Sequence, residues 1–443
     1  MINTIINLIT LNIDKAVEIG IKNNIQILQA QKENEKLISD LIKARSQLLP
    51  QVSINSIYTY TANPAVIKFG APTKYIGYPD PNNPNQFIIY PDPNSIVYSE
   101  IPFRPSNSYN LQLTIRQSIF SWFREINAIK LAEQQLKIQS DIISLNQHRL
   151  ANQIKSFYLD ILFFKETFII YEKTLQDLEL VYNTTKKRFE NGLASDIELM
   201  QAKVNYENAR FNYENAKKTY IDLLNNLKTI LNIPSNEEVV IEDNIDIVKI
   251  DTNIVIDETK IKRRKDLLVL EEQMKNLQRL AEIQNSLNKP NIFGQIQYVA
   301  SIPSPSLENK LGGTWTFSII FNWNVFDGFS TNAEVKKINE QINELKLIYD
   351  FQVQSSQNQL KSAIENLNIS RANLERTKEN AQLSEKLLNS AKAQFENGLI
   401  SNLQFFEIQR SYIASQISYK QALKDHYKAI LDLDLILNAG KTQ

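Results

Sequence analysis

Cysteine is absent from this 443-residue sequence, and glycine and proline are scarce, with 10 and 14 residues. Without cysteine the chain as given is expected to form no disulfide bond, to offer no thiol nucleophile and to carry no lipid on an N-terminal cysteine. Glycine and proline are the residues that most often interrupt helices and strands, so their scarcity predicts long elements rather than a typical globular enzyme. Most prolines fall between residues 61 and 106, where the breaks are therefore concentrated.

Neither sign of charge is in excess, since Lys+Arg and Asp+Glu are 49 each, and nothing in the composition predicts a nucleic-acid partner. No stretch approaches the ~18 to 20 continuous apolar residues of a transmembrane helix. Residues 1 to 9 are apolar but lack the positive start and the small-residue cleavage site of a secretory signal. Two locations stay open on this basis: the cytoplasm, or export by a signal that this sequence does not show.

Groups that could carry catalysis are also sparse. His148 and His426 stand alone, without neighbours at metal-ligand spacing. Neither a Gly-rich phosphate loop nor a nucleophile motif is present. The sequence therefore predicts a protein that is not an enzyme, with no catalytic residues, no cofactor and no metal.

One motif occurs twice. The pattern Phe-Glu-Asn-Gly-Leu-x-Ser covers residues 189–195 and again residues 395–401. Glycine just past a periodic apolar run ends a helix because it enters the left-handed conformation at little steric cost, and a serine three residues on can cap the next helix. The motif therefore predicts tight turns between helices at 191–195 and 397–401, and its recurrence predicts an internal two-fold repeat.

The first half shows helical periodicity up to Pro50, over residues 12–49, and then a strand-like alternation over 52–60. The proline-rich residues 61–106 predict a long irregular loop, and alternation returns over 108–118. Residues 124–190 contain no glycine or proline and carry apolar residues every seven positions, which predicts a coiled-coil helix of about 100 Å. A further helix is expected over 196–232.

The second half repeats this order. Helix is expected over 263–288, strands over 292–298 and 314–325 around a shorter loop, helix over 331–396, and a last helix to about residue 438. Residues 233–262 form a mixed segment that the pattern does not place. We therefore divide the chain into a first repeat (1–240), an equatorial mixed segment or linker (233–262) and a second repeat (263–443).

The four expected strands are apolar on one face and polar on the other. Such faces suit either a packed sheet in a soluble protein or a lipid-facing sheet with a polar lumen. Trp315 and Trp323 share the apolar face eight residues apart, about 27 Å along a strand, which favours the two aromatic girdles of an outer-membrane barrel. Because four strands cannot close a barrel, this interpretation requires several copies of the chain.

Several motifs together resemble the TolC-like outer-membrane efflux proteins. They are the two Phe-Glu-Asn-Gly-Leu-x-Ser turns, Gln201-Ala202, Asn205-Tyr206-Glu207-Asn208-Ala209, Leu231-Asn232-Ile233-Pro234, Leu48-Leu49-Pro50-Gln51-Val52 and Val325-Phe326-Asp327-Gly328-Phe329. The resemblance covers nearly the whole chain except residues 61–106. It implies a mainly α fold with a membrane β-barrel: a homotrimer whose four strands per protomer form a 12-stranded barrel in the outer membrane of a Gram-negative-type bacterium, above a long α-helical coiled-coil barrel in the periplasm.

The same resemblance implies a function. The trimer would be a passive exit duct of a tripartite efflux or type I secretion system, embedded in outer-membrane lipid and supplied by an inner-membrane pump and a periplasmic adaptor. The turns would form the tip that docks the adaptor, with Gly192, Leu193, Ser195, Gly398, Leu399 and Ser401 as the docking residues. The alternative is that these residues only end and begin helices.

A gate is implied next to the second turn. In the type member of the family an arginine two residues after the second turn glycine helps to latch the tip, whereas this sequence has Ile400. The two acidic positions further in are held by Gln404 and Glu407, and Glu198 takes the matching place after the first turn. These residues imply a latch without an ion pair and one acidic ring, although a solvated helix-face role for Glu407 stays open.

A function of a different class also stays open, a soluble or surface coiled-coil interaction protein whose strands form an ordinary packed sheet. The sequence does not identify the transported substrate.

Overall fold

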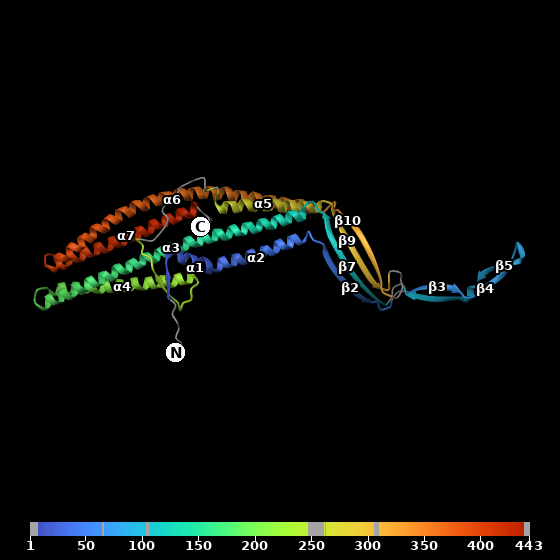
Figure 1. The fold of residues 1–443 in the computed structure, drawn as a ribbon, viewed down its shortest axis with the longest axis horizontal. Coiled ribbons are helices and arrows are strands. Elements are labelled where there is room, and N and C mark those ends of the chain that lie inside the picture. Colours follow the sequence, from blue (N-terminus) through green and yellow to red (C-terminus); the bar gives the residue numbers. More distant parts are fainter. Residues whose placement is uncertain are drawn as a thin grey trace, which may run out of the picture. The chain divides into compact units, whose positions relative to one another are not determined.

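The computed structural model describes residues 8–63, 66–102, 106–246, 261, 263–304 and 310–437. These fall into two compact units, which Figure 1 draws as one ribbon. The first unit contains residues 1–41, 130–281 and 336–443 and is built from helices. The second contains residues 42–129 and 282–335 and is built around strands.

The helices follow the expected order. They are α1 (Ile13–Asn23), α2 (Ile25–Ser46), α3 (Arg124–Glu190), α4 (Asp196–Ile230), α5 (Lys265–Asn285), α6 (Ser330–Glu396) and α7 (Asn402–Leu437). Short 3-10 turns lie at Pro93–Ser95 and Ser286–Asn288. Among the described helices, none has a stretch apolar enough to cross a membrane.

The first expected helix, 12–49, is divided at Asn24. The backbone of Asn24 is extended, and its N–H donates to the carbonyl of Gly20, which closes α1. Its side-chain oxygen accepts from the N–H groups of Gln26 and Ile27, at 2.9 and 3.2 Å, which starts α2. Asparagine competes with the helix for backbone hydrogen bonds, so a single residue ends one helix and caps the next.

The core of the helical unit lies where a short parallel pair of strands meets the helices. Strand β1 (Leu8–Leu11) pairs with β8 (Glu238–Ile241). The fully buried Tyr158 of α3 donates from its hydroxyl to the carbonyl of Leu11 and to the carboxylate of Asp243, each at 3.0 Å. The described part of the expected mixed segment 233–262 therefore packs on α3 through β8. Residues 247–260 and 262 of that segment lie outside the described residues.

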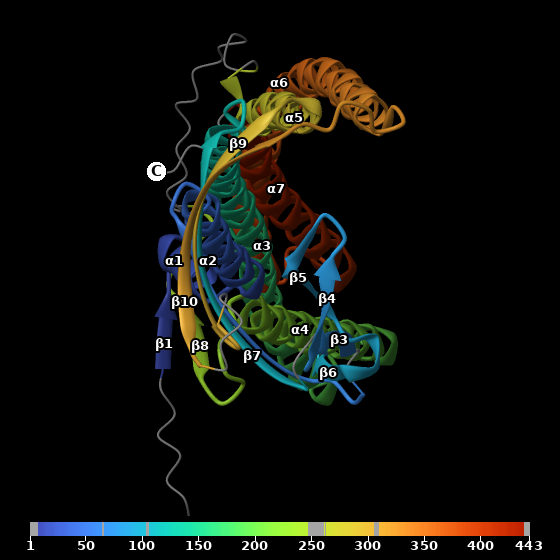
Figure 2. The same cartoon turned by 90° about the vertical axis from the view of Figure 1, so that its right-hand side faces the viewer.

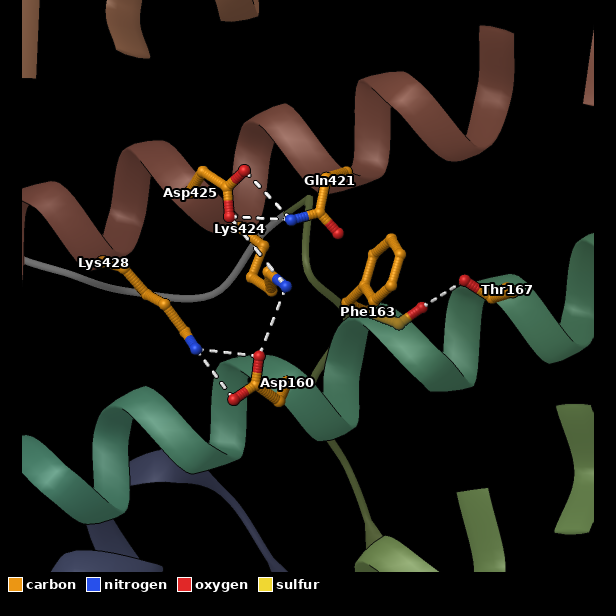
Figure 3. Close-up of polar contacts among 7 residues, drawn as sticks. All are labelled: Asp160, Phe163, Thr167, Gln421, Lys424, Asp425 and Lys428. Carbon is orange, nitrogen blue, oxygen red and sulfur yellow. Dashed lines mark hydrogen bonds and ion pairs between the residues drawn. The ribbon is translucent and has the colours of Figure 1, made fainter. Parts of the chain in front are cut away.

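Ion pairs join α3 to α7. Lys428 and Lys424 of α7 both point to Asp160 of α3, at 2.7 and 3.3 Å (Figure 3). The Lys424 ammonium also lies over the Phe163 ring, 4.7 Å from its centre, within the range of a cation–π contact. These contacts hold the two helices together side by side.

A more buried ion pair lies further along the same helices. Lys420 is 3.3 Å from the carboxylate of Glu166 and 2.5 Å from that of Asp246, and both Lys420 and Glu166 are buried. Burial alone would lower the pKa of Lys420, but its hydrogen bond to Asp246 and the two negative charges outweigh that effect and raise it. The ammonium therefore stays charged inside the helical unit.

The second unit contains a four-stranded antiparallel sheet in the order β10-β9-β7-β2, which Figure 2 shows to be strongly curved. The strands are β2 (Gln51–Tyr60), β7 (Asn107–Phe120), β9 (Asn291–Ile302) and β10 (Gly312–Asn322). Each half of the chain thus contributes one hairpin. The last strand is shorter than expected and ends before Trp323, whose indole N–H donates to the carbonyl of Asn288 at 3.1 Å.

The register of the sheet aligns like faces across all four strands. Ile54, Leu113, Tyr298 and Trp315 form one row, and Val52, Ile115, Ile296 and Phe317 form the next. The intervening row is Ser53, Thr114, Gln297 and Thr316. The alternation in the sequence therefore produces one continuous apolar face and one polar face. The apolar face is uncovered in the single chain, with Phe317 and Ile319 74% and 80% exposed.

The expectation of an irregular loop over 61–106 is wrong. Strand β3 (Val66–Pro72) pairs with β6 (Ile96–Pro102), and β4 (Tyr75–Asp80) pairs with β5 (Asn83–Pro91). Proline was the misleading signal. Both strands of a two-stranded ribbon are edges, so proline can occupy positions whose N–H has no partner, while the tyrosines and isoleucines between the prolines favour strands.

Candidate functional site

Both repeated motifs form the same helix ending. Gly192 and Gly398 have φ of +74° and +72°, a conformation that glycine adopts without strain. The Gly192 N–H donates to the carbonyl of Phe189 and the Leu193 N–H to that of Arg188, at 2.9 and 2.7 Å. The second turn has equivalent bonds, at 2.9 and 2.8 Å. This is the Schellman arrangement, which satisfies the last carbonyls of a helix.

The helix that follows each turn begins with a reciprocal cap. Ser195 Oγ accepts from the N–H of Glu198, while the Glu198 carboxylate accepts from the N–H of Ser195 at 2.7 Å. Ser401 and Gln404 repeat this pattern, with the Ser401 N–H donating to Gln404 Oε1 at 3.0 Å. In the first cap, the hydrogen bonds that Ser195 donates to the Glu198 carboxylate lower the pKa of Glu198. The Ser-x-x-Glu and Ser-x-x-Gln spacings signal such caps in a sequence. Glu198 and Gln404 therefore cap helices, and their place at a gate stays a prediction.

The leucines of the two turns are exposed. Leu193 is 69% exposed and Leu399 is 74% exposed. Nothing lies within 4 Å of the space beside Gly192 or Gly398. Each turn therefore exposes a leucine side chain directly after a glycine that leaves the surface open.

The second turn rests on an aromatic cluster. The rings of Phe395 and Phe405 are 5.1 Å apart across the turn, and both side chains are buried. Ile400, which replaces the arginine of the expected latch, is half-buried and packs on this cluster. Glu407 lies about one turn after Gln404 in α7 and is exposed. The structure thus gives Ile400 apolar contacts.

A polar contact that sequence reasoning did not identify ties the two hairpins together. Asn402, 4% exposed, donates from its side-chain amide to Thr185 Oγ1 of α3 at 3.2 Å. Lys392 of α6 pairs with Asp177 of α3 at 2.7 Å. A buried asparagine directly after a capping serine is a weak signal, because only the fold places Thr185 opposite it. The two turns are therefore parts of one packed four-helix end.

The uncovered sheet is the second candidate site. Trp315 and Trp323 are 56% and 51% exposed, as two membrane-facing aromatic residues would be. Strands β10 and β2 are the outer strands of the sheet, each with one edge that no other described strand covers. An uncovered apolar face with two open edges is unstable in water unless another surface covers it.

Comparisons with known proteins agree with these features. The family model described as outer membrane efflux protein matches residues 16–232 and 259–439. Nodulation protein T of Rhizobium leguminosarum bv. trifolii is 19% identical over 345 residues, covering 75% of this chain and 73% of that protein. The toluene efflux pump outer membrane protein TtgC of Pseudomonas putida is 24% identical over 279 residues, 60% of this chain and 55% of its own length.

Solved structures show the same fold. The Campylobacter jejuni CmeC outer membrane channel matches with a TM-score of 0.73 at 15% identity, covering 97% of this chain and 86% of that one. The open-state Neisseria gonorrhoeae MtrE outer membrane channel matches with a TM-score of 0.73 at 15% identity, covering 97% and 89%. Members of the matching family are channels rather than enzymes, and they act as trimers with an inner-membrane pump and an adaptor. This chain therefore belongs to the outer membrane efflux protein family, the outer-membrane channels of efflux pumps in Gram-negative bacteria.

Proposed function

We propose that three copies of this chain close their sheets into a 12-stranded barrel and serve as the passive exit duct for substrates that an inner-membrane pump delivers. The observation that supports this most directly is the four-stranded sheet, which has a continuous apolar face and two open edges. In lipid every backbone group needs a partner, so the β2 edge of one copy would pair with the β10 edge of the next. Family membership counts against the alternative of a soluble coiled-coil protein.

The relatives favour efflux over protein secretion. Two of them bear the names of a toluene efflux pump and an antibiotic efflux pump. We propose small organic molecules as the substrates of the present chain as well. The two repeats, residues 1–240 and 263–443, would each supply one hairpin of strands and one helical tip per copy.

The two turns are proposed as the surface that docks the adaptor. Leu193 and Leu399 would make the contact, because they are the exposed large apolar side chains within the turns themselves. Gly192 and Gly398 would shape the turns, and Ser195 and Ser401 would hold them through the caps described above. A flexible loop would present these leucines less well than two capped turns, because it would lose more conformational freedom on binding.

The gate is proposed to be apolar. Ile400 packs on the aromatic cluster, so the resting tip would be held by burial rather than by an ion pair. Glu407 would face the entrance, and Glu198 and Gln404 would lie there as well as capping the helices that follow the turns. The resting conductance should therefore rise with salt no more steeply than the conductivity of the solution does. A conductance that rises more steeply than this at high salt would indicate ion pairs at the gate.

Oligomerisation and pore formation test the main proposal. The detergent-solubilised protein should be a trimer and should open pores in planar bilayers. Because the chain has no native cysteine, single cysteines placed along β2 and β10 can report pairing between copies. Disulfides between β2 of one copy and β10 of another are the expected result, and a monomer without pores would refute the barrel.

Docking is tested by changing the exposed leucines only. Leu399→Asn and Leu193→Asn should leave the trimer and the barrel intact and abolish export of an organic dye. Leu383→Asn is a matched control, since Leu383 is 56% exposed on the side of α6 and should not contact the adaptor. Full export by the double turn variant would show that the turns only end helices.

The aromatic girdle has a separate test. Trp315 and Trp323 would lie near the two lipid–water interfaces, so their fluorescence should be quenched by brominated lipids. The third tryptophan, Trp122, donates its indole N–H to the carbonyl of Pro290 and can be replaced by phenylalanine to simplify the spectrum. Equal quenching by a water-soluble quencher would place the two side chains in water instead.

A further inference from the structure

One charged residue occurs among all the residues of the four sheet strands. It is Arg116 of β7, and the other ranges, Gln51–Tyr60, Asn291–Ile302 and Gly312–Asn322, contain neither acidic nor basic side chains. Arg116 belongs to the polar face, in a row with Gln51, Gln295 and Ser318. A single positive charge on an otherwise neutral polar surface sets the sign of the potential there.

The surroundings of Arg116 hold its guanidinium against an apolar surface. The guanidinium carbon lies 4.2 Å from the centre of the Phe293 ring. Phe293 pairs with Ile320, so these two apolar residues of the polar face lie together. Stacking on an aromatic ring leaves the N–H groups of an arginine available for an anion. Arg116 itself is exposed.

A cavity of about 690 Å³ lies beside this residue, within the second unit. Its lining includes Arg116, Lys43, Arg124, Phe293 and Leu287, which are basic or apolar. In the part of the chain that the structure describes, neither Arg116 nor Lys43 forms an ion pair. The cavity therefore combines two unpaired positive charges with an apolar wall.

The one carboxylate that lines this cavity is already occupied. Glu125 is buried, accepts hydrogen bonds from Ser121 and from Ser118, and pairs with Arg124 at 3.2 Å. It neutralises Arg124 and leaves Arg116 and Lys43 uncompensated. The net charge of the cavity is therefore positive.

We propose that Arg116, assisted by Lys43, makes this cavity a binding site for organic anions with an apolar body, and that three copies of it give the channel a preference for anions. This rests on the proposed function, in which the polar face of the sheet lines the lumen. A carboxylate or sulfonate would accept hydrogen bonds from the guanidinium, and the apolar body would lie on Phe293 and Leu287. Anions that the pump delivers would then pass more readily than cations of the same size.

The reversal potential of purified trimers in planar bilayers under a KCl gradient tests this selectivity. In a Glu407→Gln background, which removes the Glu407 carboxylates proposed at the entrance, the channel should prefer chloride, by up to about tenfold at low salt, and the preference should fade towards 1 M salt as the Debye length shrinks to about 3 Å. Arg116→Gln should lose most of the preference, Arg116→Glu should reverse it and Arg116→Lys should retain it. Thr114→Gln, on the same strand and face, is the size control and should change nothing.

A second measurement tests the site itself. Naphthalene-1-sulfonate should block the parent current at about tenfold lower concentration than naphthylmethylammonium, a cation of similar shape. Arg116→Gln should remove this difference. Parent pores whose ion preference and block do not change in Arg116→Gln would overturn the inference and leave the duct intact. If the parent protein forms no trimer and no pores, the proposed function itself fails.

Discussion

Replacement of Gly398 by alanine tests how much the left-handed backbone of the turn depends on glycine, while it changes the surface of the turn by one methyl group only. The φ of Gly398 is +72° and nothing lies within 4 Å of the position that a Cβ would take, so alanine causes no clash. Alanine does, however, destabilise the left-handed conformation by about 1–2 kcal/mol relative to glycine. It also reduces the conformational entropy of the unfolded chain, which offsets up to about 1 kcal/mol of this destabilisation. We therefore expect a net loss of about 1 kcal/mol, which makes local opening of the turn about fivefold more frequent.

Hydrogen exchange of peptides that cover residues 395–401 measures this opening. The Leu399 amide, which donates to the carbonyl of Gln394, should exchange about fivefold faster in Gly398→Ala than in the parent. Gly398→Asn should exchange more slowly than the alanine variant, since asparagine tolerates the left-handed region better. Gly192→Ala should reproduce the effect at its own turn. Unchanged exchange in both alanine variants would refute the view that left-handed glycines hold these turns.

The ion pairs and histidines of the helical unit give two further predictions. Lys420→Met leaves the carboxylate of Glu166 buried without its partner. It should lower the stability of the helical unit by about 3–5 kcal/mol, which a lower melting temperature would show. Adding Glu166→Gln to Lys420→Met should recover part of the lost stability. Burial lowers the pKa of His148 and of His426 below 6.5, because it disfavours the charged imidazolium. The stability that depends on the two histidines being neutral is therefore fully present above pH 6.5. It is lost as the pH falls through their lowered pKa values. Melting temperatures should drop on acidification, and a double His→Gln variant should show a smaller drop.

Local patterns predicted the helices and the sheet because each depends on residues close in the sequence. The absence of glycine and proline gave the bounds of α3 and α6 almost to the residue, and the period of two gave both faces of the sheet. Pairing between strands was not predictable in this way, since the alignment of Leu113 with Tyr298 depends on two distant hairpins meeting. The ribbon at 66–102 was missed because proline signals both loops and edge strands.

The candidate sites divide in the same way. The positive φ of Gly192 and Gly398 followed from the motif, as did the serine caps. The local spacing accounts for the cap hydrogen bonds of Glu198 and Gln404, while the place at a gate that the resemblance implies for them stays a prediction. Asn402, Thr185 and the surroundings of Arg116 depend on contacts between segments far apart in the chain, which no single-sequence pattern records.

The ribbon inserted between β2 and β7 has a consequence for how this surface can evolve. The β2–β7 hairpin is already paired where the insertion begins. Tyr60 pairs with Asn107, and the Thr61 N–H donates to the carbonyl of Ser106 at 2.7 Å. The register of the sheet is therefore fixed before the ribbon begins, and each doubling of the inserted length costs only about 0.6 kcal/mol in loop closure. Selection can lengthen, shorten or replace residues 66–102 while the channel stays the same, and a foreign peptide grafted there would be displayed on an unchanged sheet.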